Sequence, residues 1–458
     1  MLHQVPVLGG ASRKLVEDVD SPVTFSPDGQ RLAFVREYSD QHESALMVVN
    51  VDGTGERRLA TRKEPAHFRM EGPAWSPDGK CIAVGLEGEV VAVQVADGKE
   101  KTLSSKLGGS VGRVVWLADG SGLLLIAFDD AGRWQIWQVA YPSGQAHRIT
   151  NDTNHYQDLS LTADSKAIVA VSGSQVTRIW VSPEGKPDRP RQINPGTGKW
   201  DGRLGFSWTP EGKIVYTSSW ECCGPANLWV MDADGSNPKQ LTVAGDVGRG
   251  TSVCRDGRYI VFSRGLIIWR MDIDGGNPKQ LMSESNALAY YPRCSHDGKW
   301  VVYEFVPSAL FQSGTRTIWK IPIDGGTAAQ ITEKPCRWPA ISLDGNWIAC
   351  VLSEDSGKQQ KIAVLPFQGG PPTKTFDMPF SRVGSLDWTH DGKSVTFVAR
   401  NKGSEDIWIQ SLVGGAPRRV TEILAPTIGE HAWSPDGKQL ALEYGSSTAD
   451  AVLISNFK

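Results

Sequence analysis

A short turn motif recurs ten times along the chain and limits what the chain can fold into. The motif is Ser-Pro-Asp-Gly or a close variant, and successive copies lie 41 to 50 residues apart. Repetition at this period, built from short strands, is typical of four-stranded propeller blades. Helical repeats of similar length would need long stretches of 3.6-residue periodicity, which the sequence lacks. The acidic residues of the ten copies are Asp28, Asp78, Asp119, Asp164, Glu211, Asp256, Asp297, Asp344, Asp391 and Asp436.

Each repeat has the pattern of two β-hairpins. In residues 228–242 an apolar run meets Asp-Gly and Asn-Pro and is followed by a second short run, while residues 251–263 flank another Asp-Gly. Asp-Gly and Asn-Pro supply the backbone angles that hairpin turns require. The sequence therefore predicts strand A, an Asp-Gly turn, strand B, a loop, strand C, a Gly turn and strand D in every repeat.

Tryptophan recurs at two fixed positions of the repeat. Aromatic faces can bind sugar rings, but a residue repeated at one strand position in most blades is better explained by packing between blades. We therefore expect packing for eleven of the 17 tryptophans. They are Trp137, Trp180, Trp229, Trp269, Trp319 and Trp408 in strand C, and Trp75, Trp116, Trp208, Trp388 and Trp433 in strand A.

The repeats predict an all-β protein, with residues 1–458 forming one propeller of ten four-stranded blades. The chain begins with a C-turn-D pattern at residues 4–16 and ends with a strand C at residues 451–457. We expect residues 13–16 to pair with residues 452–455, because this would close a single ring and remove exposed strand edges. Two smaller propellers in tandem are the alternative, since ten blades exceeds the usual four to eight.

Composition and charge exclude several classes of protein. The formal net charge is −3 and no long basic block is present, so we expect no nucleic-acid partner. No run approaches the ~18 apolar residues of a membrane helix, so we expect no membrane insertion by this chain. The first ten residues do not resemble a secretory signal, which predicts a cytoplasmic chain as written. We further expect a monomer.

The seven cysteines are scattered and odd in number, which does not resemble a disulfide framework or a zinc site. We therefore expect reduced, partly buried cysteines. The adjacent Cys222 and Cys223 could instead form a strained vicinal disulfide, and their redox state is left open.

Catalytic and cofactor motifs are weak. Residues 108–112 spell Gly-Gly-Ser-Val-Gly, but the hydrolase elbow of this pattern needs a following helix, whereas residues 113–117 continue as a strand. Nicotinamide and flavin fingerprints are lacking, so we expect no cofactor. His67, His155 and His431 each precede a strand A and could converge on a channel, which keeps a metal-assisted lyase or hydrolase as the alternative function.

The variable loops are the best candidates for a binding surface. Because strands alternate in direction, the A–B and C–D turns share one face, while the variable B–C and D–A loops share the other. The B–C loops at residues 218–227 and 304–316 are long, and the second is unusually apolar. Candidate binding residues on this face are Phe68, Arg69, Tyr156, Trp200, Arg203, Trp220, Arg249, Tyr291, Arg293, Phe305, Leu310, Phe311, Arg337, Trp338 and Arg382.

The repeats resemble those of TolB-type β-propellers. The resemblance rests on the Ser-Pro-Asp-Gly hairpins and on residues 228–242, and it covers nearly the whole chain. Residues 5–10, 20–35 and 452–457 also resemble the extracytoplasmic half of bacterial membrane-bound serine/threonine kinases, although this chain has no kinase domain or membrane helix. The resemblance implies a non-catalytic propeller that binds a protein, peptide or glycan. If the chain is a detached sensor domain, the resemblance also implies an extracytoplasmic location.

Overall fold

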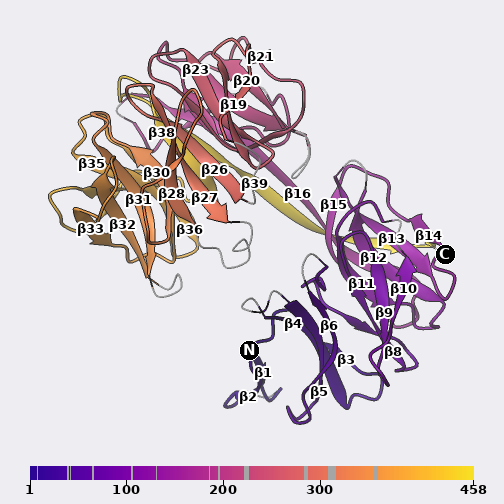
Figure 1. Ribbon diagram of the computed structural model, residues 1–458. Helices are drawn as coiled ribbons and strands as arrows, with labels where there is room; N and C mark the ends of the chain where they lie inside the picture. The colour runs from indigo at the N-terminus through magenta and orange to yellow at the C-terminus, as the bar shows by residue number, and fades with distance from the viewer. Residues whose placement is uncertain are drawn as a thin grey trace. The chain divides into compact units, whose positions relative to one another are not determined.

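The computed structural model is built from β-strands (Figure 1). It describes residues 1–7, 9–38, 41, 43–63, 66–104, 107–129, 132–184, 186–193, 196–220, 226–282, 287–307, 316–354 and 359–457. Within these ranges no helix has the length and apolar character needed to cross a membrane.

The ten predicted turns are all present between the first and second strands of their repeats. In the second repeat the Ser76 hydroxyl donates to Asp78 Oδ1 at 2.7 Å, and the amide of Lys80 donates to the same oxygen at 3.1 Å. Gly79 follows with a φ of 71°, a conformation that favours glycine. In the fourth repeat Ser165 takes that place with a φ of 52°. The motif recurs because each of its residues has a role in the turn.

Contacts divide the chain into two compact units. Unit 1 comprises residues 1–174 and 447–458, and unit 2 comprises residues 175–446. Two long strands, β16 (Ala167–Ser182) and β39 (Leu440–Ser455), pair with each other and contribute residues to both units. Unit 2 is thus a continuous segment inserted into the sequence of unit 1.

Unit 1 contains a hairpin followed by three complete four-stranded sheets and a final sheet formed by β15 with parts of β16 and β39. Its inner strands β3, β7, β11 and β15 contact one another in series. Its own strands are β1 (Leu2–Gln4), β2 (Arg13–Val16), β3 (Thr24–Phe25), β4 (Arg31–Tyr38), β5 (Glu43–Asn50), β6 (Arg57–Lys63), β7 (Ala74–Trp75), β8 (Cys81–Gly85), β9 (Val90–Gln94), β10 (Glu100–Ser104), β11 (Val111–Trp116), β12 (Gly122–Phe128), β13 (Trp134–Ala140), β14 (Ala146–Arg148) and β15 (His155–Leu161).

Unit 2 forms a ring of six four-stranded sheets in the described residues. Its sixth sheet has the order β38, β39, β16, β17, so strands from both ends of the unit complete one blade. The inner strands contact their neighbours around the ring, and β38 contacts β18 to close it. The strands are β17 (Arg191–Gln192), β18 (Phe206–Trp208), β19 (Ile214–Ser219), β20 (Ala226–Met231), β21 (Lys239–Gln240), β22 (Val247–Val253), β23 (Tyr259–Arg264), β24 (Ile267–Asp272), β25 (Lys279–Gln280), β26 (Ala287–Cys294), β27 (Trp300–Pro307), β28 (Thr317–Pro322), β29 (Ala329–Gln330), β30 (Cys336–Ile341), β31 (Trp347–Glu354), β32 (Gln359–Pro366), β33 (Lys374–Asp377), β34 (Arg382–Trp388), β35 (Ser394–Asn401), β36 (Ser404–Ser411), β37 (Arg418–Arg419) and β38 (Ile428–Trp433).

The multi-blade propeller is as predicted, but closure into a single ten-blade ring is not confirmed. Residues 13–16 form β2 and pair with β1, while residues 452–455 belong to β39, which pairs with β16. The expected pairing of these two segments is therefore wrong. A local hairpin at residues 2–16 closes a short loop, whereas the expected pairing would join segments more than 430 residues apart at a higher cost in chain entropy.

Neighbouring blades bury their apolar faces against each other, as the tryptophan pattern predicted. One cluster joins Val215 and Leu228 of one blade to Ile260 and Phe262 of the next. Burying such side chains contributes about 1.5–3 kcal/mol each. The predicted Trp positions lie in strands A and C, and Trp116 Nε1 also donates to the carbonyl of Ala74 in the preceding blade at 3.1 Å.

The expectation that the cysteines are reduced is wrong for four of them. Cys254 pairs with Cys294 across two neighbouring blades, and Cys336 pairs with Cys350 within one blade. Cys81 is a buried free thiol, and Cys222 and Cys223 lie outside the described residues. Spacing in the sequence did not reveal these pairs, because the propeller brings together cysteines 40 residues apart in one pair and 14 apart in the other.

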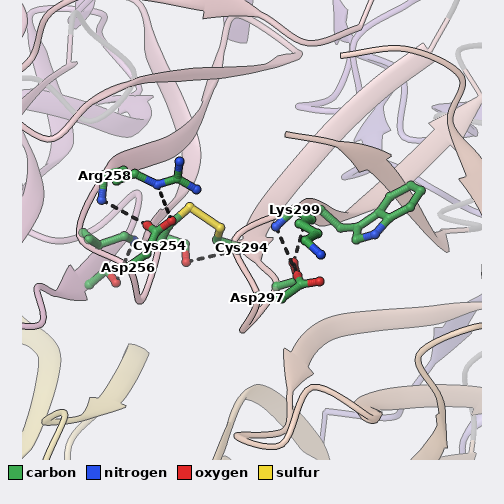
Figure 2. The surroundings of a disulfide bond; sticks show 11 residues. Cys254, Asp256, Arg258, Cys294, Asp297 and Lys299 are labelled. Atoms are coloured by element: carbon green, nitrogen blue, oxygen red, sulfur yellow. Dashed lines mark hydrogen bonds and ion pairs between the residues drawn. A yellow bond between two sulfur atoms is a disulfide. The ribbon is translucent and has the colours of Figure 1, made fainter. Parts of the chain in front are cut away.

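The Cys254–Cys294 bond lies between two Asp-Gly turns (Figure 2). Cys254 occupies the position that Ser76, Ser295 and Ser434 hold in other repeats, where the hydroxyl donates to the turn aspartate. A disulfide sulfur cannot donate, and Asp256 instead pairs with Arg258 at 2.6 Å. Cys254 thus exchanges the usual turn hydrogen bond for a covalent link to the next blade.

Candidate functional site: the channel of unit 2

The inner strands of unit 2 surround a channel and carry irregularities at corresponding places. The pairing register shifts within β22, β26, β30, β34 and β38, ahead of the last residues of each strand. Bulges of this kind redirect individual side chains and are common beside functional sites. Because each inner strand follows a D–A loop, the bulges lie toward the variable face.

Two of these bulges hold aromatic residues in a strained backbone conformation. Tyr291 in β26 has a φ of 50° and Trp338 in β30 has a φ of 57°. The two rings lie 4.2 Å apart between centroids. At the same repeat position two other blades have Gly205 and Gly250, for which a positive φ is unstrained. Such strain costs on the order of 1–3 kcal/mol per residue and clusters at functional sites.

A buried carboxylate supports this aromatic pair. Glu304 in β27 is fully buried, and its Oε1 accepts a hydrogen bond from the Trp338 amide at 2.6 Å. Its Oε2 accepts from Arg316 Nη1 at 2.9 Å, and the Arg316 guanidinium also lies over the Tyr290 ring. Burial raises the pKa of Glu304, while Arg316 acts in the opposite direction. Glu304 therefore holds the strained Trp338 backbone in place.

A second buried cluster of charges links β26 to β38. Arg293 Nη2 of β26 lies 3.5 Å from Glu430 Oε2 of β38, and Glu430 is only 4% exposed. Burial raises the pKa of Glu430, and the positive charges of Arg293 and Arg203 oppose that effect. The cluster therefore alternates guanidinium and carboxylate groups.

Glu443 extends this cluster and has an uncompensated oxygen. It is buried, and its Oε2 has no hydrogen-bond partner among the described residues. Burial raises its pKa to about 7; Arg203 lowers the value and Glu430 raises it. A Cβ at Gly429 would stand 1.8 Å from Oε2, so only glycine leaves room for this carboxyl group.

The other end of the channel, toward the A–B turns, contains a cavity of about 280 Å³. All six inner strands or their turns contribute to it. Its apolar wall includes Phe206, Trp208 and Leu386. Its charged groups include Arg255, Arg293, Asp387, His296 and His431.

Two of the cavity's polar groups are held rigidly. Asp387 accepts hydrogen bonds from the amides of Trp388 at 2.8 Å and Trp433 at 2.9 Å. His431 Nε2 lies 2.9 Å from Thr396 Oγ1, whereas its Nδ1 has no partner among the described residues. Burial, followed by the charge of Arg293, lowers the pKa of His431 to about 3, so the imidazole is neutral at physiological pH.

The predicted arginines of unit 2 are neutralised to different degrees. Arg382 Nη1 pairs with Glu405 Oε1 at 2.7 Å, in addition to the pairing of Arg293 with Glu430. Burial raises the pKa of Tyr291 and of Glu304, and the positive charges of Arg249 and Arg337, respectively, oppose that effect. Unit 2 therefore brings together Arg203, Arg249, Tyr291, Arg293, Arg337 and Trp338 around its channel.

Other predicted residues have structural surroundings or lie elsewhere. Phe68 and Tyr156 belong to unit 1 and are buried, and Arg69, also in unit 1, pairs with Glu71 at 3.0 Å. Trp200 is buried and its amide donates to the carbonyl of Ser219. Phe305 lies in β27, where its ring packs against Trp319. Trp220 is 64% exposed, and Leu310 and Phe311 fall outside the described residues.

The buried carboxylates are the part of the site that the sequence analysis missed. Glu304 stands within Val-Val-Tyr-Glu-Phe and Glu443 within Leu-Ala-Leu-Glu-Tyr, so each interrupts an otherwise apolar strand. Such an interruption is the signal that could have identified them, because a charged residue is rarely fully buried without a partner. The sequence analysis also missed Asp387, which lies directly before a predicted strand-A tryptophan.

The histidines considered for a metal do not share a unit. His67 and His155 belong to unit 1 and His431 to unit 2. Among the described residues, no group of three His, Cys, Asp or Glu side chains is arranged to hold a metal ion. Residues 108–112 lead into strand β11, and Ser110 donates to Glu87 at 2.6 Å.

Comparisons with known proteins agree with the repeat pattern. Residues 9–189 match the family model described as the TolB beta propeller domain. The chain is 26% identical over 156 residues to dipeptidyl-peptidase 5 of Porphyromonas gingivalis, covering 31% of this chain and 22% of that protein. It is 29% identical over 151 residues to the uncharacterized peptidase YuxL of Bacillus subtilis, covering 32% of this chain and 20% of that protein. The matched segment spans about a fifth of the length of these curated relatives.

A solved structure of TolB from Acinetobacter baumannii is also similar. It is 18% identical, the match covers 74% of this chain and 62% of that one, and the TM-score is 0.24. The repeat pattern, the strand topology and the family match together indicate a TolB-like propeller.

Proposed function

We propose that this TolB-like β-propeller protein is a non-catalytic binding protein that holds a peptide segment at the variable face of unit 2. The observation that carries the proposal is the half-buried Trp338, held in a strained bulge with its ring against the buried ring of Tyr291, which is strained as well. Strain that is retained in two adjacent blades indicates a use for these particular side chains.

The charges around the aromatic pair favour a peptide over a neutral glycan. Arg249 and Arg337 supply cations on this face, while Glu430 is buried and already paired with Arg293. A peptide offers backbone amides, charged side chains and apolar side chains that suit such a mixed surface. A neutral sugar would use the aromatic ring and leave the charged groups without partners.

The disulfides support an extracytoplasmic location. Stable disulfides form mainly in oxidising compartments, and the two bonds join strands within unit 2. This inference replaces the cytoplasmic expectation drawn from the first residues, and it agrees with the resemblance to the sensor halves of bacterial membrane kinases. We propose a sensor role on that basis. Labelling of thiols in intact cells and after lysis tests it, since reduced Cys254 and Cys294 would contradict an oxidising location.

Peptide binding can be tested with a defined panel and one matched pair of variants. The panel contains short acidic, basic and apolar peptides together with neutral oligosaccharides, and thermal unfolding of the full chain is the readout. Trp338→Gly removes the ring and keeps the positive φ without strain. Trp269→Ala removes a half-buried indole from the third strand of a blade and serves as the control.

We expect at least one peptide to raise the melting temperature of the wild type and of Trp269→Ala, with the shift lost in Trp338→Gly. Stabilisation by oligosaccharides alone would contradict the peptide assignment. Turnover of any panel peptide would contradict the non-catalytic role, and the peptidases similar to part of this chain make that a necessary measurement.

A further inference from the structure

The cavity at the A–B turn end of unit 2 has an arginine on each side of a disulfide. Arg255 directly follows Cys254, and Arg293 directly precedes Cys294. The bond joins the two neighbouring blades with a Cα separation of 5.1 Å. Both arginines and Cys294 line the cavity. The covalent link therefore restrains the spacing of two guanidinium groups that come from different blades.

The two arginines differ in how they are neutralised. Arg293 donates from Nη1 to the carbonyl of Thr251 at 3.3 Å and lies near Glu430. Arg255 forms no hydrogen bond or ion pair with any described residue, although it lines the same cavity. Arg255 is exposed as a whole residue but borders the cavity, and a guanidinium without a protein partner beside a second one is suited to a carboxylate, which accepts two parallel hydrogen bonds from arginine.

Asp387 supplies the opposite charge in the same cavity. Its two oxygens each accept a backbone amide, which fixes the carboxylate in place. Burial raises the pKa of Asp387, and the positive charges of Arg293 and Arg255 both oppose that effect, so the three groups interact electrostatically. Each carboxylate oxygen has a second lone pair, so Asp387 can also accept from an ammonium group.

The remaining lining suits a small molecule. Phe206, Trp208, Leu386 and Trp433 offer apolar surface, and the His431 imidazole, which is 3% exposed, has a free Nδ1. A cavity of about 280 Å³ is large enough for an amino acid or a dipeptide. We propose that this cavity is a second ligand site, separate from the aromatic pair, that binds an amino-acid-sized zwitterion with its carboxylate at Arg255 and Arg293 and its ammonium group at Asp387.

The test is titration of the full chain at pH 7 with L-alanine, L-leucine, L-glutamate and glycylglycine, followed by calorimetry and thermal unfolding. Succinate and inorganic phosphate serve as anions without an ammonium group, and butylamine serves as a cation without a carboxylate. The variants are Arg255→Met and Asp387→Asn. Arg258→Met is the control, because Arg258 belongs to the same turn and pairs with Asp256 outside the cavity lining.

We expect at least one zwitterion to bind at millimolar concentration or better. Its Kd should rise at least tenfold in Arg255→Met and in Asp387→Asn, and should stay within twofold in Arg258→Met. Binding by glycylglycine but not by free amino acids would identify a peptide terminus as the source of the zwitterion, and the reverse would identify a free amino acid. Arg255→Met keeps the test decisive if Asp387→Asn does not fold, since Arg255 has no described partner to lose.

Three results would overturn the proposal. The first is the lack of binding by any of the four zwitterions, and the second is an unchanged Kd in Arg255→Met. The third is binding of succinate or phosphate that equals zwitterion binding and persists in Asp387→Asn, which would indicate a simple anion site. Trp338→Gly should leave zwitterion binding unchanged, so this experiment is independent of the peptide site at the other end of the channel.

Discussion

Trp208 Nε1 donates a hydrogen bond to the carbonyl oxygen of Ala432 at 3.2 Å, across 224 positions of sequence. The bond joins the inner strand β18 of one blade to the inner strand β38 of another, at the place where the ring of unit 2 closes. Trp116 and Trp388 make the equivalent bond to Ala74 and Ala340 in their preceding blades. Trp116, Trp208 and Trp388 therefore tie successive blades together, and Trp208 completes the ring of unit 2.

Removing this donor should weaken unit 2. Trp208→Phe keeps an aromatic ring but removes the indole donor from the half-buried Ala432 carbonyl, so we expect a loss of about 1 kcal/mol in the free energy of unfolding. Trp408→Phe is the matched control, because the Trp408 Nε1 has no described partner. Denaturant unfolding of both variants checks the difference, and equal losses would show that the hydrogen bond does not contribute.

Gly250 allows two blades to approach closely. A Cβ on this residue would lie 2.4 Å from the Cα of Tyr291, and its φ is 92°. We expect Gly250→Ala to cost more than the ~1 kcal/mol of an unfavourable φ, since backbone must move as well. Gly212→Ala is the control, with a φ of 78° and no atom within 4 Å of the new Cβ. Thermal unfolding of the two variants should rank Gly250→Ala as the less stable, and the reverse order would contradict the close approach.

The Cys254–Cys294 bond should stabilise the ring by lowering the conformational entropy of the unfolded chain. It closes a segment of 40 residues, whereas Cys336–Cys350 closes one of 14. Chain-entropy arguments give about 3–4 kcal/mol for loops of these sizes, with the larger value for the longer loop. We expect Cys254→Ser/Cys294→Val to lose more unfolding free energy than Cys336→Ala/Cys350→Val, measured without reductant. A larger loss from the shorter loop would indicate that packing outweighs chain entropy.

Glu443 should make stability depend on pH near neutrality. Its pKa is raised to about 7 from an ordinary value of 4.5, so the folded state favours the protonated form. Glu443 therefore stabilises the folded state most below pH 4.5. As the pH rises from 4.5 to 7, its contribution to the free energy of unfolding falls by up to ~3 kcal/mol. Glu443→Gln should gain stability over the wild type at pH 8 and little at pH 5. Glu184→Gln, at an exposed carboxylate, is the control, and an equal gain at both pH values would refute the assignment.

The turns were predictable from sequence because their determinants are local. Ser76, Asp78 and Gly79 contact one another within four residues, so a motif reports the structure directly. The same holds for the strand-A and strand-C tryptophans, whose position in the repeat is enough to place them between blades.

The division into units depends on pairing between distant strands, which the repeat does not encode. Ser174 and Ser447 stand where β16 and β39 pass from one unit to the other, and the Gly-Ser sequences around them resemble an ordinary B–C loop. The bulge residues Tyr291 and Trp338 were named from sequence as unusual aromatics, but their contact with each other required the ring. The hydrogen bond between Glu304 and the Trp338 amide could not be foreseen. It joins the second strand of one blade, which also contains Tyr291, to the first strand of the next blade.

Unit 2 occupies the place of one hairpin connection in the chain of unit 1. In the last sheet of unit 1, the first strand is β15 and the second is the beginning of β16, while the third is the end of β39. Residues 175–446 therefore take the place of a hairpin loop, and Thr448 Oγ1 donates to the Ser174 carbonyl at the base of that loop. A loop whose two ends are already held side by side tolerates long additions at small entropic cost. The strand connectivity of unit 1 is therefore interrupted at one place only, so the ends of unit 2 leave and re-enter it through neighbouring strands.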